Sequence, residues 1–374
     1  MKKTLTICLV LVGVIFFFSA PLPAEDKSLE ERVSNLEKKV GGIEFFGSVR
    51  VATFYNDVDT ATGDDETLTW DNQLTSRIGA RFTRDKIFGM YELSVDDDAG
   101  LSTRRLFATY DMGWGSLKIG QDYTPIGLLN YSNQVYADDA NLITYGNPAE
   151  RRTVMVQLAV KGFKIAFVED RGSSKMNATS GDVDSLTPKL EVSYRLSNQN
   201  YFVDVFGGFL SYSVDDVIID ATNFGDKTVN CWITGVGGGI TLDPVFVRGL
   251  IYYAQNGKNL DMAIRDAAGA QFDTTGSVVD ETNAGGYLVV GSKVGKCTVE
   301  AGFGYGYSQL DDAVGTYGDD KNTIMAYYLN TTIPVYGSFI IVPEIGVLDY
   351  LDDSFGDDEK KATRYIGAKW QIDF

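Results

Sequence analysis

The chain of 374 residues contains no histidine, and this absence excludes catalysis that depends on an imidazole acid or base. Only three cysteines are present, at positions 8, 231 and 297, so the chain is not a disulfide scaffold. Cys231 and Cys297 fall on predicted strands that are not adjacent, and we expect two free thiols. A net charge of −18 argues against nucleic acid as a partner.

The first 24 residues are predicted to be a secretory signal peptide. Lys2 and Lys3 precede an apolar run over residues 5–18, and a small-residue stretch over residues 19–24 follows it. The run is short for a transmembrane helix, which needs roughly 20 apolar residues. The alternative is an uncleaved N-terminal anchor. After residue 24 no long apolar stretch remains, so the sequence offers no other transmembrane helix.

Residues 25–42 are predicted to contain a short helix. Ser28 and Glu31 form a capping box, and Gly41 with Gly42 ends the helix. The apolar residues follow the a/d spacing of a coiled coil, at Leu29, Val33, Leu36, Val40 and Ile43. Two heptads are too short to be stable alone. Two interpretations remain open: a helix packed against another part of the protein, and a trimerisation helix whose three copies meet beneath joined barrels.

From residue 43 to residue 374 the apolar pattern changes to a period of two. Val49 and Val51 share one face of the first segment, and Ser48 and Arg50 share the other. The same alternation recurs along the chain, for example where Glu300 is flanked by apolar neighbours. Such an apolar face contacts a second sheet in a globular sandwich and contacts lipid in a transmembrane barrel.

The connections distinguish these two architectures. The predicted strands are residues 43–56, 67–84, 86–96, 101–112, 114–122, 150–161, 163–170, 186–197, 199–213, 228–243, 245–256, 283–294, 296–309, 321–333, 335–351 and 361–374. Very short joints alternate with longer ones, which are residues 57–66, 123–149, 171–185, 214–227, 257–282, 310–320 and 352–360, with 97–100 as a brief exception. Short turns at one end and long loops at the other are typical of membrane barrels, whereas a sandwich has no reason for this alternation. The sequence therefore predicts an all-β fold, a transmembrane antiparallel barrel of about sixteen strands.

Aromatic residues make up 12% of the chain, with 21 tyrosines and 21 phenylalanines. Many lie near predicted strand ends, where amphipathic rings would meet the membrane boundary: Tyr110, Trp114, Tyr201, Phe202, Trp232, Tyr252, Tyr253, Tyr327, Tyr328 and Trp370. For any one of them, an ordinary position in a sheet core is the alternative.

Two segments resemble known outer-membrane proteins. The last strand, residues 365–374, alternates and ends in Phe374, and it resembles the C-terminal signature that the barrel-assembly machinery recognises. Residues 114–125, Trp-Gly-Ser-Leu-Lys-Ile-Gly-Gln-Asp-Tyr-Thr-Pro, resemble the fifth strand of the Gram-negative general porins. This resemblance implies that residues 123–149 fold into the barrel as a constriction loop. It also implies a homotrimer in the outer membrane, in contact with lipid and lipopolysaccharide.

A helix ahead of a barrel further resembles the DcaP-like branch of these porins, whose members are trimeric and take up dicarboxylates.

The strand faces predict a basic wall in the lumen. Four arginines from strands one, two and four point inward, and a fifth joins them from strand six: Arg50, Arg77, Arg81, Arg105 and Arg151. The infolded loop carries three carboxylates that could form an opposing acidic face: Asp122, Asp138 and Asp139. Arginine stays charged at any relevant pH, and opposed charges orient solutes and set ion preference. The alternative for each arginine is a solvated lumen residue without a special role.

These features favour a porin through which small hydrophilic solutes and ions diffuse, with anions preferred at the arginine wall. A selective channel for small organic acids is the alternative within the same class. Acidic clusters in the loops suit divalent cations in chemistry, but none has the ligand spacing of a known calcium loop, and we expect no metal or cofactor. An enzyme would need paired carboxylates for which we find no signature, and an adhesin would need longer loops.

Overall fold

The computed structural model describes residues 42–60, 63–95, 100–127, 129–148, 152–170, 183–185, 187–264, 267–312, 314, 321–352 and 360–374. Contacts divide the chain into two units, residues 1–43 and 44–374. The predicted signal peptide and N-terminal helix lie outside the described residues, apart from Gly42, and so does Arg151. Within the described ranges, no helix combines the length and the hydropathy needed to cross a bilayer.

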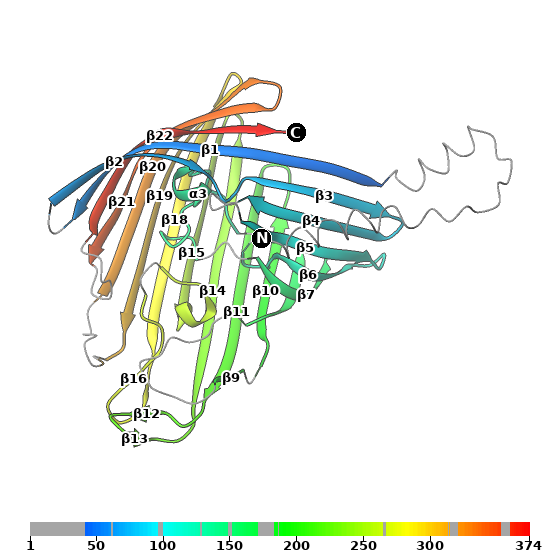
Figure 1. Cartoon of the computed structure of the whole chain (residues 1–374). Coiled ribbons are helices and arrows are strands. Elements are labelled where there is room, and N and C mark those ends of the chain that lie inside the picture. Colours follow the sequence, from blue (N-terminus) through cyan, green and yellow to red (C-terminus); the bar gives the residue numbers. More distant parts are fainter. Residues whose placement is uncertain are drawn as a thin grey trace, which may run out of the picture. The chain divides into compact units, whose positions relative to one another are not determined.

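Eighteen antiparallel strands form one sheet that closes on itself when β22 pairs with β1 (Figure 1). They are β1 (Ile43–Thr60), β2 (Gly63–Asn72), β3 (Arg77–Arg84), β4 (Ile87–Val95), β5 (Leu101–Asp111), β6 (Ser116–Tyr123), β7 (Arg152–Val160), β8 (Phe163–Val168), β9 (Val183–Ser185), β10 (Lys189–Ser197), β11 (Tyr201–Val214), β14 (Lys227–Leu242), β15 (Val245–Gln255), β18 (Glu281–Val294), β19 (Cys297–Leu310), β20 (Lys321–Tyr336), β21 (Phe339–Asp352) and β22 (Lys360–Asp373).

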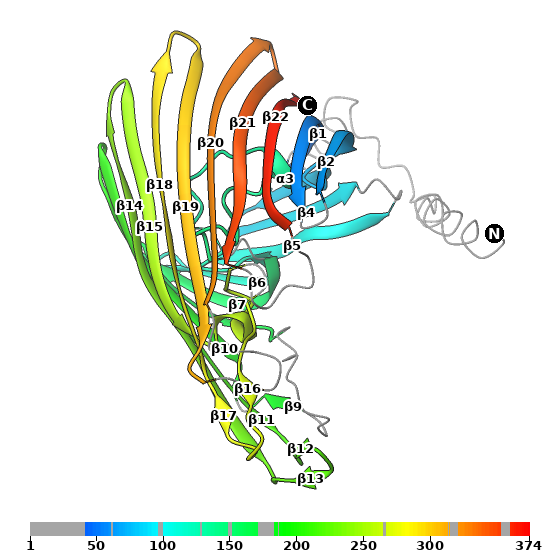
Figure 2. The same cartoon turned by 90° about the vertical axis from the view of Figure 1, so that its left-hand side faces the viewer.

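Four short strands form two hairpins outside this sheet (Figure 2). They are β12 (Ile218–Ile219), β13 (Thr222–Asn223), β16 (Gln271–Phe272) and β17 (Val278–Val279). The described helices are the short α3 (Tyr136–Asp139) and the 3-10 turn η1 (Gly257–Leu260).

The described wall of the barrel consists of sixteen staves, where a stave is one strand, or two successive strands that share one position in the ring. β2 and β3 both pair with β1 and form one stave that is interrupted at residues 73–76, and β9 and β10 both pair with β11. Eighteen strands therefore give sixteen staves, which confirms the predicted strand number. The predicted continuous strand at residues 67–84 is wrong in its middle, where the chain leaves the ladder.

Tight connections at one end of the barrel, here called the turn end, alternate with longer ones at the other, the loop end. The turn-end connections span residues 85–86, 112–115, 161–162, 198–200, 243–244, 295–296 and 337–338. Gly295 and Gly337 adopt positive φ angles of 61° and 55°, which a tight turn requires and glycine tolerates. The predicted alternation of turns and loops is confirmed. The predicted loop at residues 57–66 is wrong, because β1 and β2 stay paired as far as Thr60 and Gly63.

The two faces of the sheet differ in polarity. Outward side chains such as Val49, Leu288 and Phe303 are about half exposed, while their inward neighbours Ser48 and Glu300 are buried. A closed ring leaves no unpaired strand edge, and an apolar outer face suits lipid, so the barrel is a transmembrane one. Trp114 and Tyr110 lie on this outer face near the turn end, as predicted for the membrane boundary.

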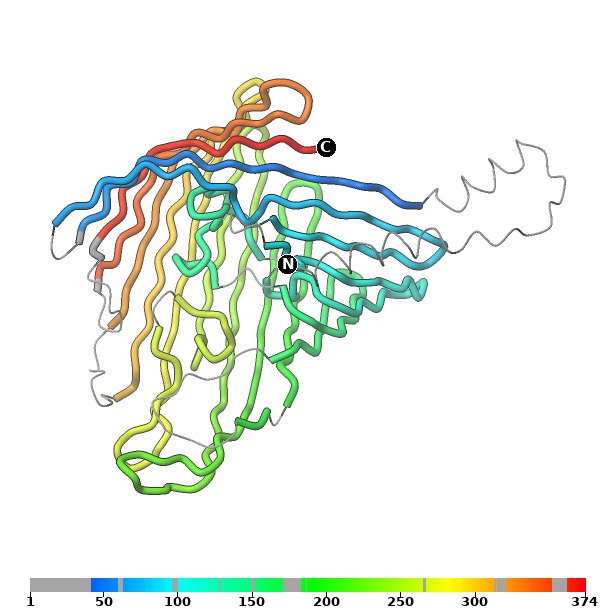
Figure 3. Tube along the Cα trace, in the orientation of Figure 1, coloured from blue at the N-terminus to red at the C-terminus, as the bar shows by residue number. Residues whose placement is uncertain are grey.

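Three of the aromatic predictions are wrong. Phe202 lies on the inner face, with its ring 5.0 Å from that of Tyr131 in the infolded loop. Tyr252 and Tyr328 also lie on the inner face and are almost completely buried, because large parts of the lumen are filled with protein. Two infolded segments fill it, residues 124–127 with 129–148, and residues 256–264 with 267–272, which Figure 3 shows inside the ring of strands. The second of these was predicted to be part of an outer loop at residues 257–282. Burying its apolar side chains favours the inward position.

Candidate functional site

The interruption of the second stave supplies hydrogen-bond donors to the lumen. At residues 73–76 the ladder with β1 is replaced by the Ser76 hydroxyl, which accepts from the Arg50 amide at 2.9 Å and donates to the Arg50 carbonyl at 3.0 Å. The three residues before Ser76 then reach the infolded loop. The side-chain amide of Gln73 donates through Nε2 to the Val135 carbonyl, and the Leu74 backbone N–H donates to the Asp138 carboxylate at 2.6 Å. The break in the strand is thus where the wall contacts the loop.

Residues 124–148 cross the lumen along the inner face of β10–β22 and are held by carboxylates on that wall. Glu344 accepts the backbone N–H groups of Val135 and Tyr136 at 2.8 and 3.0 Å, and Glu300 accepts that of Asn133 at 2.7 Å. Side-chain acceptors on β19 and β21 therefore satisfy loop amides that would otherwise be buried without a partner.

Glycines make room for the loop. A Cβ placed on Gly304 would lie 1.8 Å from the Tyr145 carbonyl oxygen, and one on Gly306 would collide with Ile264 of the second infolded segment. The loop path is therefore fixed both by the acceptors on the wall and by the missing side chains between them.

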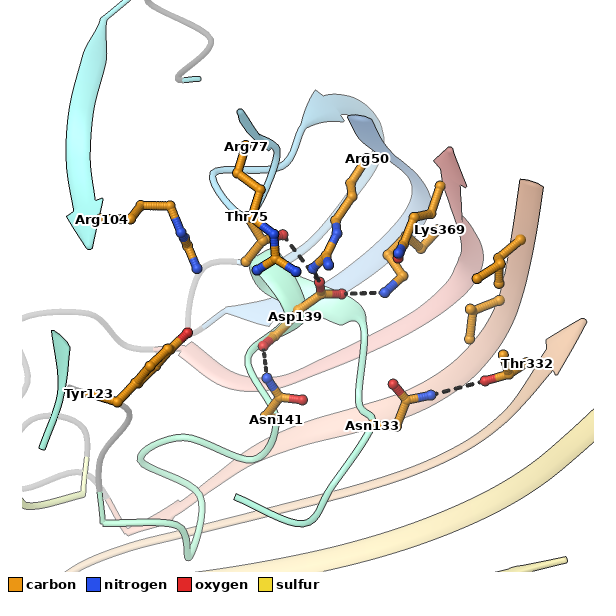
Figure 4. A pocket seen from close by; sticks show the side chains of 13 residues that line it. Arg50, Thr75, Arg77, Arg104, Tyr123, Asn133, Asp139, Asn141, Thr332 and Lys369 are labelled. Atoms are coloured by element: carbon orange, nitrogen blue, oxygen red, sulfur yellow. Dashed lines mark hydrogen bonds and ion pairs between the residues drawn. The ribbon is translucent and has the colours of Figure 1, made fainter. Parts of the chain in front are cut away.

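A cavity of about 380 Å³ opens where the loop tip meets the first and last strands (Figure 4). Its lining residues are Arg50, Thr75, Arg77, Arg104, Tyr123, Asn133, Asp139, Asn141, Thr332, Ile340, Val342, Lys369 and Gln371. Four of these side chains are cationic and one is a carboxylate, so the cavity is basic.

Asp139 joins the loop to the seam between β1 and β22. Its carboxylate contacts the Arg50 guanidinium at 2.5 Å and the Lys369 ammonium at 3.0 Å, and it accepts the Thr75 hydroxyl at 3.1 Å (Figure 4). The prediction placed this carboxylate across an open gap from the arginines. The structure places it in direct contact with them.

The other two cations share Glu92. The Arg104 Nε lies 2.9 Å from one oxygen of Glu92, and the Arg77 Nε lies 3.8 Å from the other. Glu92 and Arg104 are buried, whereas 30% of the Arg77 side chain is exposed. Arg77 is therefore the cation in this group that is most accessible to a solute.

Arg104 was not among the predicted site residues. Strict alternation along β5 places Arg105 inside and Arg104 outside. The register between β4 and β5 shifts between Glu92 and Leu93, so that Leu93 pairs with Thr103 while Glu92 pairs with Arg105. This bulge turns both arginines toward the lumen. Lys369 was also missed, although its alternation with Trp370 on β22 would have placed it on the inner face.

The remaining predicted residues lie elsewhere on the inner wall. Arg105 pairs with Asp122 at 2.6 Å, and Asp122 also pairs with Lys118. Asp122 lies at the end of β6 rather than in the infolded loop. Arg81 lies closer to the turn end, 3.5 Å from Glu44, and its side chain is 43% exposed, outside the lining of the cavity.

Further cations that the prediction did not include follow toward the turn end. Arg195 makes a bidentate contact with Asp204, at 2.7 and 2.6 Å, and Lys118 and Lys164 lie on the inner faces of β6 and β8. Alternation alone would have placed all three cations inside. Together with the cavity, they extend the basic wall along β1–β10.

The opposite part of the lumen is closed by the second infolded segment. The segment buries Leu260, Met262 and Ile264 completely or nearly so, and the buried Lys189 ammonium donates to the Leu260 carbonyl at 2.6 Å. Lys189 itself pairs with Glu191 at 3.2 Å. This side of the lumen is therefore packed with protein, whereas the cavity lies on the basic side.

Comparison with solved structures identifies the fold. The chain resembles the outer-membrane channel DcaP of Acinetobacter baumannii, with a TM-score of 0.66, 16% identity, and coverage of 89% of this chain and 97% of that one. It also resembles the trimer form of in-vitro folded OmpT, an outer membrane protein of Vibrio cholerae (TM-score 0.59, 13% identity, 89% and 99% covered). Salmonella typhi OmpF in complex with daunomycin is similar as well (TM-score 0.57, 14% identity, 89% and 99% covered).

No protein-family profile and no curated protein sequence matches the chain. At these identities the likeness concerns the fold. The chain has the sixteen-stranded fold of the porins, and with its apolar outer face it is a β-barrel of the outer membrane.

Proposed function

We propose that the barrel is a porin through which small hydrophilic solutes diffuse passively, and that it prefers anions. The observation that carries the proposal is the cavity at the loop tip, where, among the described residues, the four cations Arg50, Arg77, Arg104 and Lys369 contact two carboxylates, Asp139 and Glu92. The local charge is therefore positive although the whole chain carries −18. Fixed charge that lines a passage influences which ions enter it, whereas charge on distant loops is screened by salt.

The test is planar-bilayer recording with the purified protein in a gradient of potassium chloride. We expect stable conductance steps and a zero-current potential with the sign of chloride preference. Arg77→Gln should lower the chloride-to-potassium permeability ratio roughly twofold to threefold, while Arg77→Lys should retain it. Arg81→Gln is the matched control on the same strand, and its effect should be smaller. Electrical silence of the folded protein would exclude a porin, and cation preference would exclude the anion route.

A selective channel for small organic acids is the second candidate. It is favoured by the grouping of cations around one cavity, because two carboxylates of a single solute could contact different members of that group. Succinate added to one side should then interrupt the chloride current at millimolar concentration. Acetate is the control, since it carries a single carboxylate, and equal effects of the two acids would argue for simple diffusion.

We also propose a homotrimer, in line with the OmpT structure in its trimer form. Conductance should then appear in groups of three steps, and covalent cross-linking in detergent should yield trimers. Lipid, lipopolysaccharide and the barrel-assembly machinery remain the expected partners. For the last of these, Phe374 is presented on the rim, 69% exposed, with its backbone paired to Gly47.

A further inference from the structure

The tip of the infolded loop has an unfavourable backbone. From the tip, residues 137–139, to residue 144, six non-glycine residues adopt positive φ angles: Ala137 (51°), Asp138 (67°), Asp139 (57°), Asn141 (56°), Leu142 (59°) and Thr144 (66°). Three of them are consecutive, and residues with side chains rarely form even a single left-handed turn. The tip therefore needs contacts from outside the loop to keep this conformation.

The segments on either side of the tip are fixed independently of it. Before the tip, the Tyr136 ring stacks on Tyr365 with 3.8 Å between the centroids. After it, Leu142 is fully buried, and the Tyr145 hydroxyl donates to Tyr350 at 3.0 Å. The tip is thus a short strained arc between two anchored points, and a change in its contacts can move it without moving the rest of the loop.

The contacts that hold the tip are made by the same groups that line the cavity. The Asp139 carboxylate forms ion pairs with Arg50 and Lys369 and accepts a hydrogen bond from Thr75. All three partners face the cavity in Figure 4. Asp138 is held differently, by the Leu74 backbone N–H, which carries no charge. An anion in the cavity therefore competes directly with the carboxylate of Asp139 but not with that of Asp138.

We propose that Asp139 is a displaceable internal anion: a small oxyanion with two negative charges binds Arg50 and Lys369 in its place, and the released tip moves away and widens the passage. This rests on the proposed anion route. Chloride carries one charge on a single atom. Unlike an oxyanion, it cannot contact the two cations through separate atoms, so it passes without releasing the tip. Asp139 would thus determine which anions open the channel further.

The first test measures the affinity for sulfate from the concentration dependence of the current in single channels. In Asp139→Asn the competitor is neutral, and sulfate should bind at least about tenfold more tightly than to the wild type. Asp138→Asn is the matched control and should leave the affinity within about twofold, because Asp138 contacts a backbone N–H. Unchanged or weaker binding in Asp139→Asn would overturn the proposal.

The second test detects the movement itself. Ala137 is exposed, so Ala137→Cys in a background of Cys8→Ser, Cys231→Ala and Cys297→Ser offers one accessible thiol. A cationic methanethiosulfonate reagent should modify it several times faster in saturating sulfate than in chloride. When Asp139→Asn is added, the cysteine should react in chloride as fast as it does in saturating sulfate without that substitution. Equal rates under all these conditions would exclude movement of the tip. Cation preference in the salt gradient would instead remove the anion route, and the labelling rates would still report on the tip.

Discussion

Arg104 shows how a single extra residue changes the chemistry of the lumen. Without the bulge between β4 and β5, its guanidinium would face lipid, where a charge is costly. With the bulge, it pairs with Glu92, and both side chains are buried. Arg104 thus compensates the negative charge of Glu92. Of the two arginines next to Glu92, Arg77 is the more exposed.

Replacing Arg104 by methionine should destabilise the folded barrel by about 3 kcal/mol, because Glu92 would lose its closest partner while remaining buried. Adding Glu92→Gln should recover at least half of that loss, since the buried charge, which would otherwise keep only Arg77 at 3.8 Å, is then absent. Urea unfolding in lipid vesicles measures both. Arg105→Met is the control, because Asp122 keeps Lys118 in close contact, whereas Glu92 keeps only the more distant Arg77. An equal loss in the single and double variants would contradict this account of the pair.

Arg50 and Arg77 could be placed from the sequence because alternation is reliable wherever the ladder is regular. The contact of Arg50 with Asp139 could not, since it joins positions 89 residues apart through a loop without any periodic pattern. The position of Asp122 could not be predicted either, because a shift of one residue in the end of β6 decides whether it lies in the strand or in the loop.

The infolded segments differ in how far they could be foreseen. Residues 123–149 were assigned to the lumen by resemblance, and the structure places residues 124–148 there. Residues 257–272 were assigned to the outside, although Leu260, Met262 and Ile264 are unusually apolar for an exposed loop. The break at residues 73–76 has no glycine or proline to indicate it. It depends on the loop that it contacts, and a local pattern cannot report such a contact.

Replacing residues 258–270 by a short glycine-serine linker should raise the single-channel conductance by roughly 1.5-fold, because a packed part of the lumen becomes water. Chloride preference should fall at the same time, as ions gain a route away from the arginines. Shortening the hairpin at residues 219–222 is the control and should change neither quantity, since it lies beyond the barrel wall (Figure 2). Unchanged conductance in the first variant would mean that this side of the lumen carries no current after its segment is removed.

The barrel as a whole is electrically asymmetric. Most inner-face cations lie on β1–β10 and β22, with Arg248 on β15 apart from them, whereas the inner faces of β14–β20 are covered by the two infolded segments. Many acidic residues lie in connections at the loop end, for example at Asp215 and Asp216. The composition of the chain therefore predicts its charge but not its selectivity.

Chloride preference should weaken as salt rises, because the Debye length falls from about 10 Å at 0.1 M to about 3 Å at 1 M. It should not vanish, since the side chains of Arg50, Arg104 and Lys369 are largely withdrawn from bulk water and are screened less. Zero-current potentials measured at a fixed gradient over this range give the result. A preference that does not change with salt would indicate that size, rather than charge, selects the ions.

The position of Asp139 has a consequence for assembly. Arg50 and Lys369 belong to the first and the last strand, and they become neighbours only when β1 pairs with β22. During folding, the loop tip cannot find both partners until the ring has closed, so barrel closure and the shaping of the passage are a single late event. An unfinished barrel would expose a loose loop instead of a formed opening, and the membrane would not acquire a selective channel before the seam is complete.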